Sequence, residues 1–311
     1  MKQVGIVVML SVALSLPAAA APLSSSVRTV IPQAVQQIIS VNYRELRDSP
    51  VASALKDQVI PSDVKQFESA LRSVGIDPDR DAEQITFVSY LGPKNIVYHV
   101  GIAQGPFQQK EFLARAKARK IKPQKYLLSD IYPMGSGFEM VFLDPITILF
   151  GEVAAIQGAI DVRDNGAASL ASNNTIGDLI TDIDSAPVWS VLDQKGTQNM
   201  MRSALGQAGA LTNFNAVKKR LLASDYTMDF SDGVTFDVAV KTSDNVTAAS
   251  LSGLMNVGIL FREMTGSSSE KLALEKTTIH SSGDRVKMHF ATDNQRFQAL
   301  MKSDLFAAVS R

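Results

Sequence analysis

The apolar residues of this chain change repeatedly between a spacing near two and a spacing near 3.6. A spacing near two is typical of strands with one buried face, and a spacing near 3.6 is typical of amphipathic helices. The strand pattern is clear at Gln84–Leu91 and Tyr226–Phe230, and the helical pattern at Val153–Val162 and Val246–Phe261. Since most strands follow one another in pairs joined by short turns, we expect an α+β fold in which helices pack on mainly antiparallel sheet.

Two consecutive parts of the chain have a similar order of elements. Residues 33–186 and residues 187–311 both follow the order β-α-ββ-α-ββ-α, and the first part has an extra strand. We therefore predict two consecutive α+β units, with Trp189 in the core or at the seam between them. Such repetition is typical of an internal duplication. The two parts share negligible identity by eye, so two unlike units with a similar alternation are the alternative.

The other expected elements follow from the same spacings and from turn and capping residues. In the first unit we predict strands at 38–43, 95–103, 124–134, 138–143 and 146–150, and helices at 49–59, 61–74, 108–120 and 175–183. In the second unit we predict strands at 188–192, 234–240, 274–280 and 285–291. Its other helices are expected at 198–222, with breaks near Gly206 and Gly209, and at 294–308.

The register of a hairpin can be predicted where one face must be apolar. In the second unit, a three-residue loop Ser231–Gly233 places Met228 opposite Phe236 and so gathers the apolar residues on one face. The strands within 138–150 are apolar at nearly every position, which predicts burial on both faces and a central place in the sheet. The hairpin around Ser282 divides into an apolar face and a polar face, and the polar face would carry Lys276, His280, Arg285, Lys287 and His289.

The N-terminus has the pattern of a secretory signal peptide. Lys2 precedes the apolar run Val4–Leu16, and small residues follow at Ala18 and Ala20. A membrane-spanning helix needs about 20 apolar residues, so we predict cleavage after Ala20 and residues 1–20 as the signal peptide. Residues 21–32, which are rich in Ser and Pro, are then an exposed lead-in. The mature chain is expected to be periplasmic or secreted, with no transmembrane segment.

Composition excludes several classes of protein. The chain has no Cys, so a disulfide framework, thiol catalysis and a Cys-ligated metal are excluded. Its 31 basic and 31 acidic residues give a net charge of zero, which argues against a nucleic-acid-binding protein. With 45% hydrophobic residues among 311, the chain can bury a substantial core.

No residue pattern identifies a reaction, a cofactor or a metal. His280 and His289 share the cationic hairpin face, where positive neighbours oppose a metal ion, and His99 fits an ordinary strand. The segment Asp77–Asp81 begins like a calcium loop, but Ala82 stands where that loop requires Gly. Phosphate-binding Gly motifs and a Gly-x-Ser-x-Gly nucleophile motif are absent from the sequence. We therefore expect no catalytic, cofactor-binding or metal-binding residues, and paired carboxylates are the one catalytic arrangement left open.

One segment gathers positive charge. From Lys110 to Lys125 there are seven cations against the single acid Glu111, on a predicted helix whose inner face would hold Phe112 and Ala116. A solvated helix face is the simpler interpretation. The functional interpretation is contact with an anionic partner, such as an envelope polymer, a lipid headgroup or an acidic protein. The candidate contact residues are Lys110, Arg115, Lys117, Arg119, Lys120, Lys122 and Lys125.

Several local patterns of turns and caps occur across residues 38–192. They are Leu46–Pro50, Gly75–Asp79, Gly105–Phe107, Phe142–Asp144 with Gly151, Ile160–Asp161 and Ser169–Asn173 before Trp189. In these patterns the chain resembles a poorly characterised group of exported bacterial proteins of unknown function. The resemblance implies export and an α+β sheet fold, and it implies no activity and no catalytic residue.

Three functional hypotheses follow. The first is a non-catalytic exported binding protein of the envelope or the secreted fraction, whose partner is an anionic envelope component or an apolar ligand. The second is a hydrolase that uses paired carboxylates in a groove between the units. The third is a periplasmic carrier of lipid or another apolar ligand, which requires a large apolar cavity.

Overall fold

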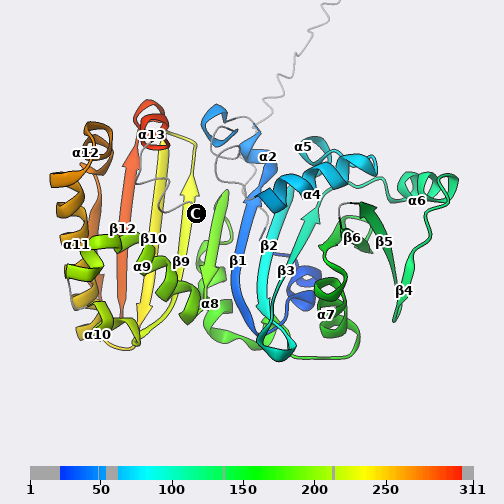
Figure 1. Ribbon diagram of the computed structural model, residues 1–311, viewed down its shortest axis with the longest axis horizontal. Helices are drawn as coiled ribbons and strands as arrows, with labels where there is room; N and C mark the ends of the chain where they lie inside the picture. Colours follow the sequence, from blue (N-terminus) through cyan, green and yellow to red (C-terminus); the bar gives the residue numbers. More distant parts are fainter. Residues whose placement is uncertain (1–21, 48, 54–61, 136, 212–213, 303–311) are drawn as a thin grey trace, which may run out of the picture.

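Figure 1 shows the computed structural model of the chain, which describes residues 22–47, 49–53, 62–135, 137–211 and 214–302. The first predicted unit contributes the strands β1 (Val35–Asn42), β2 (Gln84–Leu91), β3 (Val97–Gln104), β4 (Gln124–Tyr126), β5 (Ser129–Gly135), β6 (Phe138–Asp144) and β7 (Thr147–Gly151). The second contributes β8 (Val188–Leu192), β9 (Leu221–Asp229), β10 (Val234–Thr242), β11 (Thr278–Ser282) and β12 (Arg285–Thr292). All of these strands pair antiparallel in one sheet of order β11-β12-β10-β9-β8-β1-β2-β3-β7-β6-β5-β4. The predicted α+β fold is confirmed.

The first strands of the two units meet at the middle of this sheet. Strand β1 pairs with β8, and Ile39 lies opposite Ser190. From this seam the first unit runs outward as β1-β2-β3-β7-β6, and the second runs outward in the matching order β8-β9-β10-β12-β11. Matching strand orders are what a duplication predicts.

The described helices connect and cover the strands. They are α1 (Ser25–Val30), α2 (Tyr43–Leu46), α4 (Ser62–Ser73), α5 (Pro78–Asp81), α6 (Gln109–Ala118), α7 (Val153–Asp164), α8 (Asn174–Ile183), α9 (Gln194–Leu211), α10 (Phe214–Lys218), α11 (Asn245–Thr265), α12 (Ser268–Leu274) and α13 (Asn294–Leu300), with short 3-10 turns at Pro93–Asn95 and Leu170–Ser172.

Successive residues of each strand point to opposite faces, so the sheet carries separate cores on its two sides. On one side, α1, α7 and α8 pack over the first unit and the seam, in a core that contains Ile38, Leu149 and Trp189. Trp189 is 1% exposed, and this core also includes Val191 and Ala223 of the second unit. One hydrophobic core therefore spans both units.

The other side of the sheet is covered by two groups of helices. Over the first unit, α4 and α6 pack on Ile85, Ile148 and neighbouring residues. Over the second unit, α9, α10 and α11 pack on β10 through Val238 and Val240. The helix α13 docks beside them, where Phe297, Leu300 and Met301 are buried with Phe290 and Val234.

The predicted hairpin registers of the second unit are confirmed. Met228 lies opposite Phe236, so the apolar residues of β9 and β10 share one face. In the next hairpin, Ile279 lies opposite Met288 and Lys287 lies opposite His280. The face that carries Lys287, His280 and His289 is exposed.

The segment 21–32 was expected to be an exposed lead-in, and this prediction is wrong for its described residues. Ser24 caps the helix α1, and Val27, Val30 and Ile31 are at most 1% exposed. These three residues have the i, i+3, i+4 spacing of one helical face, which the Ser and Pro content of the segment concealed. The signal peptide, residues 1–20, lies outside the described residues.

Four other element predictions differ from the structure. The helix α9 continues through Gly206 and Gly209 to Leu211, since an isolated Gly weakens a helix without ending it. The strand expected at 274–280 is preceded by the short helix α12, which begins with a capping box of Ser267 and Glu270.

Strand β7 is buried along its whole length as predicted, but it lies away from the middle of the sheet. The strand expected at 124–134 is a hairpin, β4–β5.

Candidate anionic-partner site

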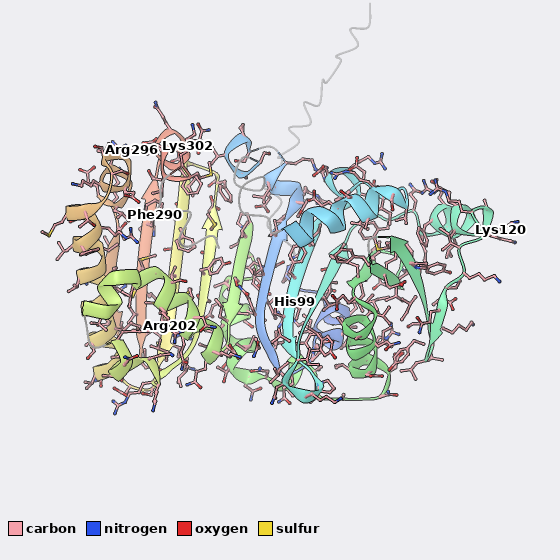
Figure 2. The ribbon with its side chains drawn as sticks, viewed as in Figure 1. His99, Lys120, Arg202, Phe290, Arg296 and Lys302 are labelled. Carbon is pink, nitrogen blue, oxygen red and sulfur yellow. The ribbon has the colours of Figure 1, made fainter. Side chains whose placement is uncertain are left out.

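The seven predicted cations lie on one part of the structure, which we call the cationic arm. The arm consists of α6, the connecting residues 119–123 and the hairpin β4–β5. Strand β4 is the last strand of the sheet. Figure 1 shows the arm at the opposite end of the sheet from α11 and α12, and Figure 2 shows Lys120 at the far end of the molecule from Arg296.

A narrow apolar face holds α6 on the sheet. Phe112 and Ala116 are buried, and they are one helical turn apart. The ring of Phe112 packs edge-on against Tyr132, with centroids 5.3 Å apart, and against Phe142 at 5.4 Å. Because this face is so narrow, most of the helix surface is left in solvent.

Two of the seven cations are turned toward the body of the protein. The guanidinium of Arg115 lies over Gly75, where an added Cβ would come within 2.5 Å of its Nη1. Arg119 donates from Nη1 to the carbonyl oxygen of Ser73 at 3.2 Å. These contacts anchor α6 to the end of α4, so we treat both arginines as positioning residues.

The lysines of the arm face solvent. Lys125 is 3.8 Å from Asp130, and both side chains are exposed, so this pair contributes little. The other four lysines are exposed and have no ion-pair partner within the described part of the chain. They are Lys110, Lys117, Lys120 and Lys122. From residue 109 to residue 130, seven cations against Glu111 and Asp130 give a net charge of +5, and the local potential is correspondingly positive.

The tip of the β4–β5 hairpin carries two exposed leucines. Tyr126 pairs with Ser129, which leaves Leu127 and Leu128 as a two-residue turn. Their exposed fractions are 50% and 93%. Leu127 has φ 50°, in the left-handed region that Gly and Asn occupy more readily. An apolar side chain at such a position costs folding free energy without gaining burial.

The turn is held in place by two hydrogen bonds to α7. The hydroxyl of Tyr126 donates to Oδ1 of Asp161 at 2.8 Å, and this bond raises the pKa of Tyr126. Nη2 of Arg163 donates to Oγ of Ser129 at 2.8 Å. Since both residues that flank the turn are hydrogen-bonded to α7, the turn that exposes Leu127 and Leu128 is held in one position on the protein.

The exposure of these two leucines is not predicted from the sequence. The strand expected at 124–134 places them in its interior, because the turn contains none of the residues that usually mark one. The available signal was the pair of adjacent apolar residues, which breaks the alternation of a strand with one buried face.

The other residues considered from the sequence have structural partners. Nδ1 of His99 is 2.8 Å from Oγ of Ser89, and Nδ1 of His289 is 2.7 Å from Oδ1 of Asp237. Asp77 caps α5 as the predicted turn requires. Among the described residues, no three His, Asp or Glu side chains are grouped as metal ligands.

The buried acids of the described chain lie on separate elements. Glu68 on α4 accepts a hydrogen bond from Tyr43, and Glu270 caps α12 through the backbone of Ser267. Asp225 lies on β9, where burial raises its pKa to about 6. These three acids are not paired with one another. The acid that acts on Asp225 is Asp182, which is exposed and lies 3.5 Å from Arg285.

A small cavity lies at the root of the arm. Its volume is about 60 Å³, whereas pockets for small molecules usually have about 300–1,000 Å³. Its lining is mixed, and includes Gly75, Arg80, Asp81, Phe107, Glu111 and Arg115. The cavity has room for a few water molecules, and it is far smaller than an ordinary small-molecule pocket.

Comparisons with known proteins give distant structural similarity. No family model matches the sequence, and no curated protein matches it. Crystal form I of TP0453 aligns with 91% of this chain and 97% of its own, at 9% identity and a TM-score of 0.48. Crystal form III of the same protein aligns with 88% and 96%, at 7% identity and a TM-score of 0.47. No helix among the described residues combines the length and the apolar character needed to cross a membrane.

Proposed function

We propose that this protein is an exported, non-catalytic binding protein that docks on an anionic component of the cell envelope through its cationic arm. The observation that carries the proposal is the group of four exposed lysines, Lys110, Lys117, Lys120 and Lys122, with no ion-pair partner within the described part of the chain. The export part of the proposal rests on the signal-peptide pattern of residues 1–20.

The position of the arm favours contact with a large partner. The chain as a whole has a net charge of zero, and the arm at one end has a net charge of +5. The molecule therefore has a preferred orientation in the field of an anionic surface, with the arm toward it. Such a field orients the protein during approach and raises the rate of association. Contact of this kind weakens with salt, because the Debye length falls from about 10 Å at 0.1 M to about 3 Å at 1 M.

Contacts within the arm also support a binding role over simple solvation. A solvated helix face needs no fixed orientation, yet Arg115 and Arg119 hold α6 in one place on the body of the protein. Lysines on an edge strand protect it from pairing with other strands, which accounts for Lys125 on β4. It does not account for Lys110 and Lys117, which lie on α6.

The test is retention of the mature protein on immobilised heparin, used as a polyanionic probe, along a gradient of NaCl. The variant Lys110→Gln, Lys117→Gln, Lys120→Gln and Lys122→Gln is expected to elute at much lower salt than the natural protein. A matched control removes four exposed lysines elsewhere, Lys195, Lys219, Lys271 and Lys276, and it is expected to elute near the natural protein. Equal loss of retention in both variants would overturn the proposal, because binding would then depend on total charge alone.

A further inference from the structure

We infer that the anionic partner of the cationic arm is a lipid bilayer, into whose headgroup region the Leu127–Leu128 turn inserts. The inference rests on the proposed function and names its partner. The observation that carries it is the position of the exposed apolar turn Leu127–Leu128, which directly follows the lysines of the cationic arm.

The first step is the chemistry of the turn. Leu128 is 93% exposed and Leu127 is 50% exposed with φ 50°. A polar or glycine residue would remove both the apolar exposure and the backbone strain. Strained or unfavourable residues persist where the surrounding structure fixes them, and they gather at functional positions. Here the flanking residues are fixed on α7 by the bonds from Tyr126 and Arg163.

The second step is the charge around the turn. Lys120 lies in the turn that ends α6, Lys122 follows in the connection, and Lys125 lies on the edge strand β4. Lys110 and Lys117 extend the positive surface over α6. Of the two acids of the neighbouring α7, Asp164 pairs with Arg163 at 2.6 Å, whereas Asp161 accepts a hydrogen bond from Tyr126 and keeps its negative charge. Adding Asp161 to residues 109–130 lowers their net charge from +5 to +4, so positive charge still predominates around the two leucines, as an anionic headgroup layer requires.

The third step compares the possible anionic partners. A polysaccharide or another soluble polyanion would use the lysines and leave two leucines in water. A protein interface needs about 800 Å² from each partner, far more apolar contact than a two-residue turn offers. A bilayer with anionic lipid uses both features, because reversible membrane anchoring combines an apolar insertion with a polybasic patch.

The depth of insertion is limited by the backbone. The N–H and C=O groups of a turn cannot all be satisfied within the hairpin, and unsatisfied groups are excluded from the hydrocarbon core. The two leucines therefore reach the boundary between headgroups and acyl chains, while the lysines stay at the level of the phosphates.

The experiment measures binding of the mature full chain to vesicles of phosphatidylglycerol and phosphatidylcholine in about equal parts, and to vesicles of phosphatidylcholine alone. We expect binding to the anionic vesicles only. The variant Leu127→Ser with Leu128→Ser is expected to lose on the order of tenfold to a hundredfold in vesicle affinity, with unchanged retention on heparin. Each lysine removed from the arm is expected to cost about fivefold.

A matched control changes two exposed apolar residues at the other end of the sheet. Val257 and Leu260 on α11 are 46% and 57% exposed, and Val257→Ser with Leu260→Ser is expected to bind the anionic vesicles as the natural protein does. A second probe is Leu128→Trp, whose fluorescence should be quenched by brominated acyl chains in the anionic vesicles. This probe reports insertion directly.

The outcomes separate the inference from the proposed function. If the natural protein binds heparin but not the anionic vesicles, or if the double Leu→Ser variant keeps its vesicle affinity, the lipid inference is overturned and the proposed function stands. If the natural protein binds neither probe, the proposed function fails and the inference fails with it. Loss of vesicle binding in the α11 control would move the contact to α11 and overturn the inference.

Discussion

Asp225 is the described acid whose protonation we expect to affect stability most clearly. It lies on β9 with 8% exposure, and burial raises its pKa from 3.8 to about 6, with Asp182 adding to the increase and Arg285 and Lys287 opposing it. In the unfolded chain its pKa is near 3.8, so the folded state holds this proton more tightly. Its contribution to stability is therefore largest below the unfolded pKa and is lost as pH rises through about 6.

The variant Asp225→Asn tests this assignment. At pH 7.5 it removes a buried charge, and we expect the free energy of unfolding to rise by up to about 3 kcal/mol. Near pH 3.5, where the natural residue is mostly protonated in both states, the two proteins should differ little. Urea unfolding at the two pH values provides the measurement. A variant that is less stable at pH 7.5 would mean that Arg285 stabilises the ionised form by more than burial destabilises it.

Leu127 has a strained backbone conformation, which a single substitution can test. Because its φ is 50°, Leu127→Gly removes a strain of about 1–2 kcal/mol and adds back some chain entropy in the unfolded state. We expect a melting temperature equal to or above that of the natural protein, together with weaker binding to anionic vesicles. Thermal unfolding and vesicle co-sedimentation of the same sample measure both effects. A clear fall in melting temperature would show that Leu127 supports the fold.

At the scale of elements, the hairpin β4–β5 depends on its attachment to α7. Tyr126→Phe removes the hydrogen bond to Asp161 and keeps the ring, and we expect a loss of about 1 kcal/mol in stability. Amide hydrogen exchange should become faster in β4 and β5 and stay unchanged in β9 and β10. Vesicle binding should weaken while retention on heparin is kept. Unchanged exchange in the hairpin would contradict the role assigned to this bond.

At this same scale, sequence and structure agree where the apolar spacing is regular. Elements with regular spacing were predicted closely, such as β2 at Gln84–Leu91 and β8 at Val188–Leu192. Errors arose where composition conflicted with periodicity. The Ser-rich segment around α1 concealed an apolar helical face, and the β4–β5 turn at Leu127–Leu128 lacks the residues that mark turns. The seven cations of the arm could be predicted from the sequence. Which of them anchor α6 could not, because that depends on the contacts of Arg115 with Gly75 and of Arg119 with Ser73.

At the scale of the whole molecule, the seam between β1 and β8 makes the two units interdependent. The core over the seam contains Ile38 of the first unit with Trp189 and Val191 of the second. A core shared in this way cannot be lost from one unit alone, so we expect the two units to unfold together.

This expectation can be measured because the chain has one Trp, and Trp189 lies at the seam. The unfolding transition followed by Trp189 fluorescence should coincide with the transition followed by far-UV circular dichroism. Two transitions at different urea concentrations would show that the units unfold separately in spite of their common sheet.

The orientation of the whole molecule on its partner is the central claim, and hydrogen–deuterium exchange of the mature protein on phosphatidylglycerol vesicles tests it most directly. We predict protection confined to residues 109–130, which include α6 and the Leu127–Leu128 turn, and loss of that protection at high salt. Protection along α11 or across β9–β12, with residues 109–130 exchanging as in free solution, would contradict the account.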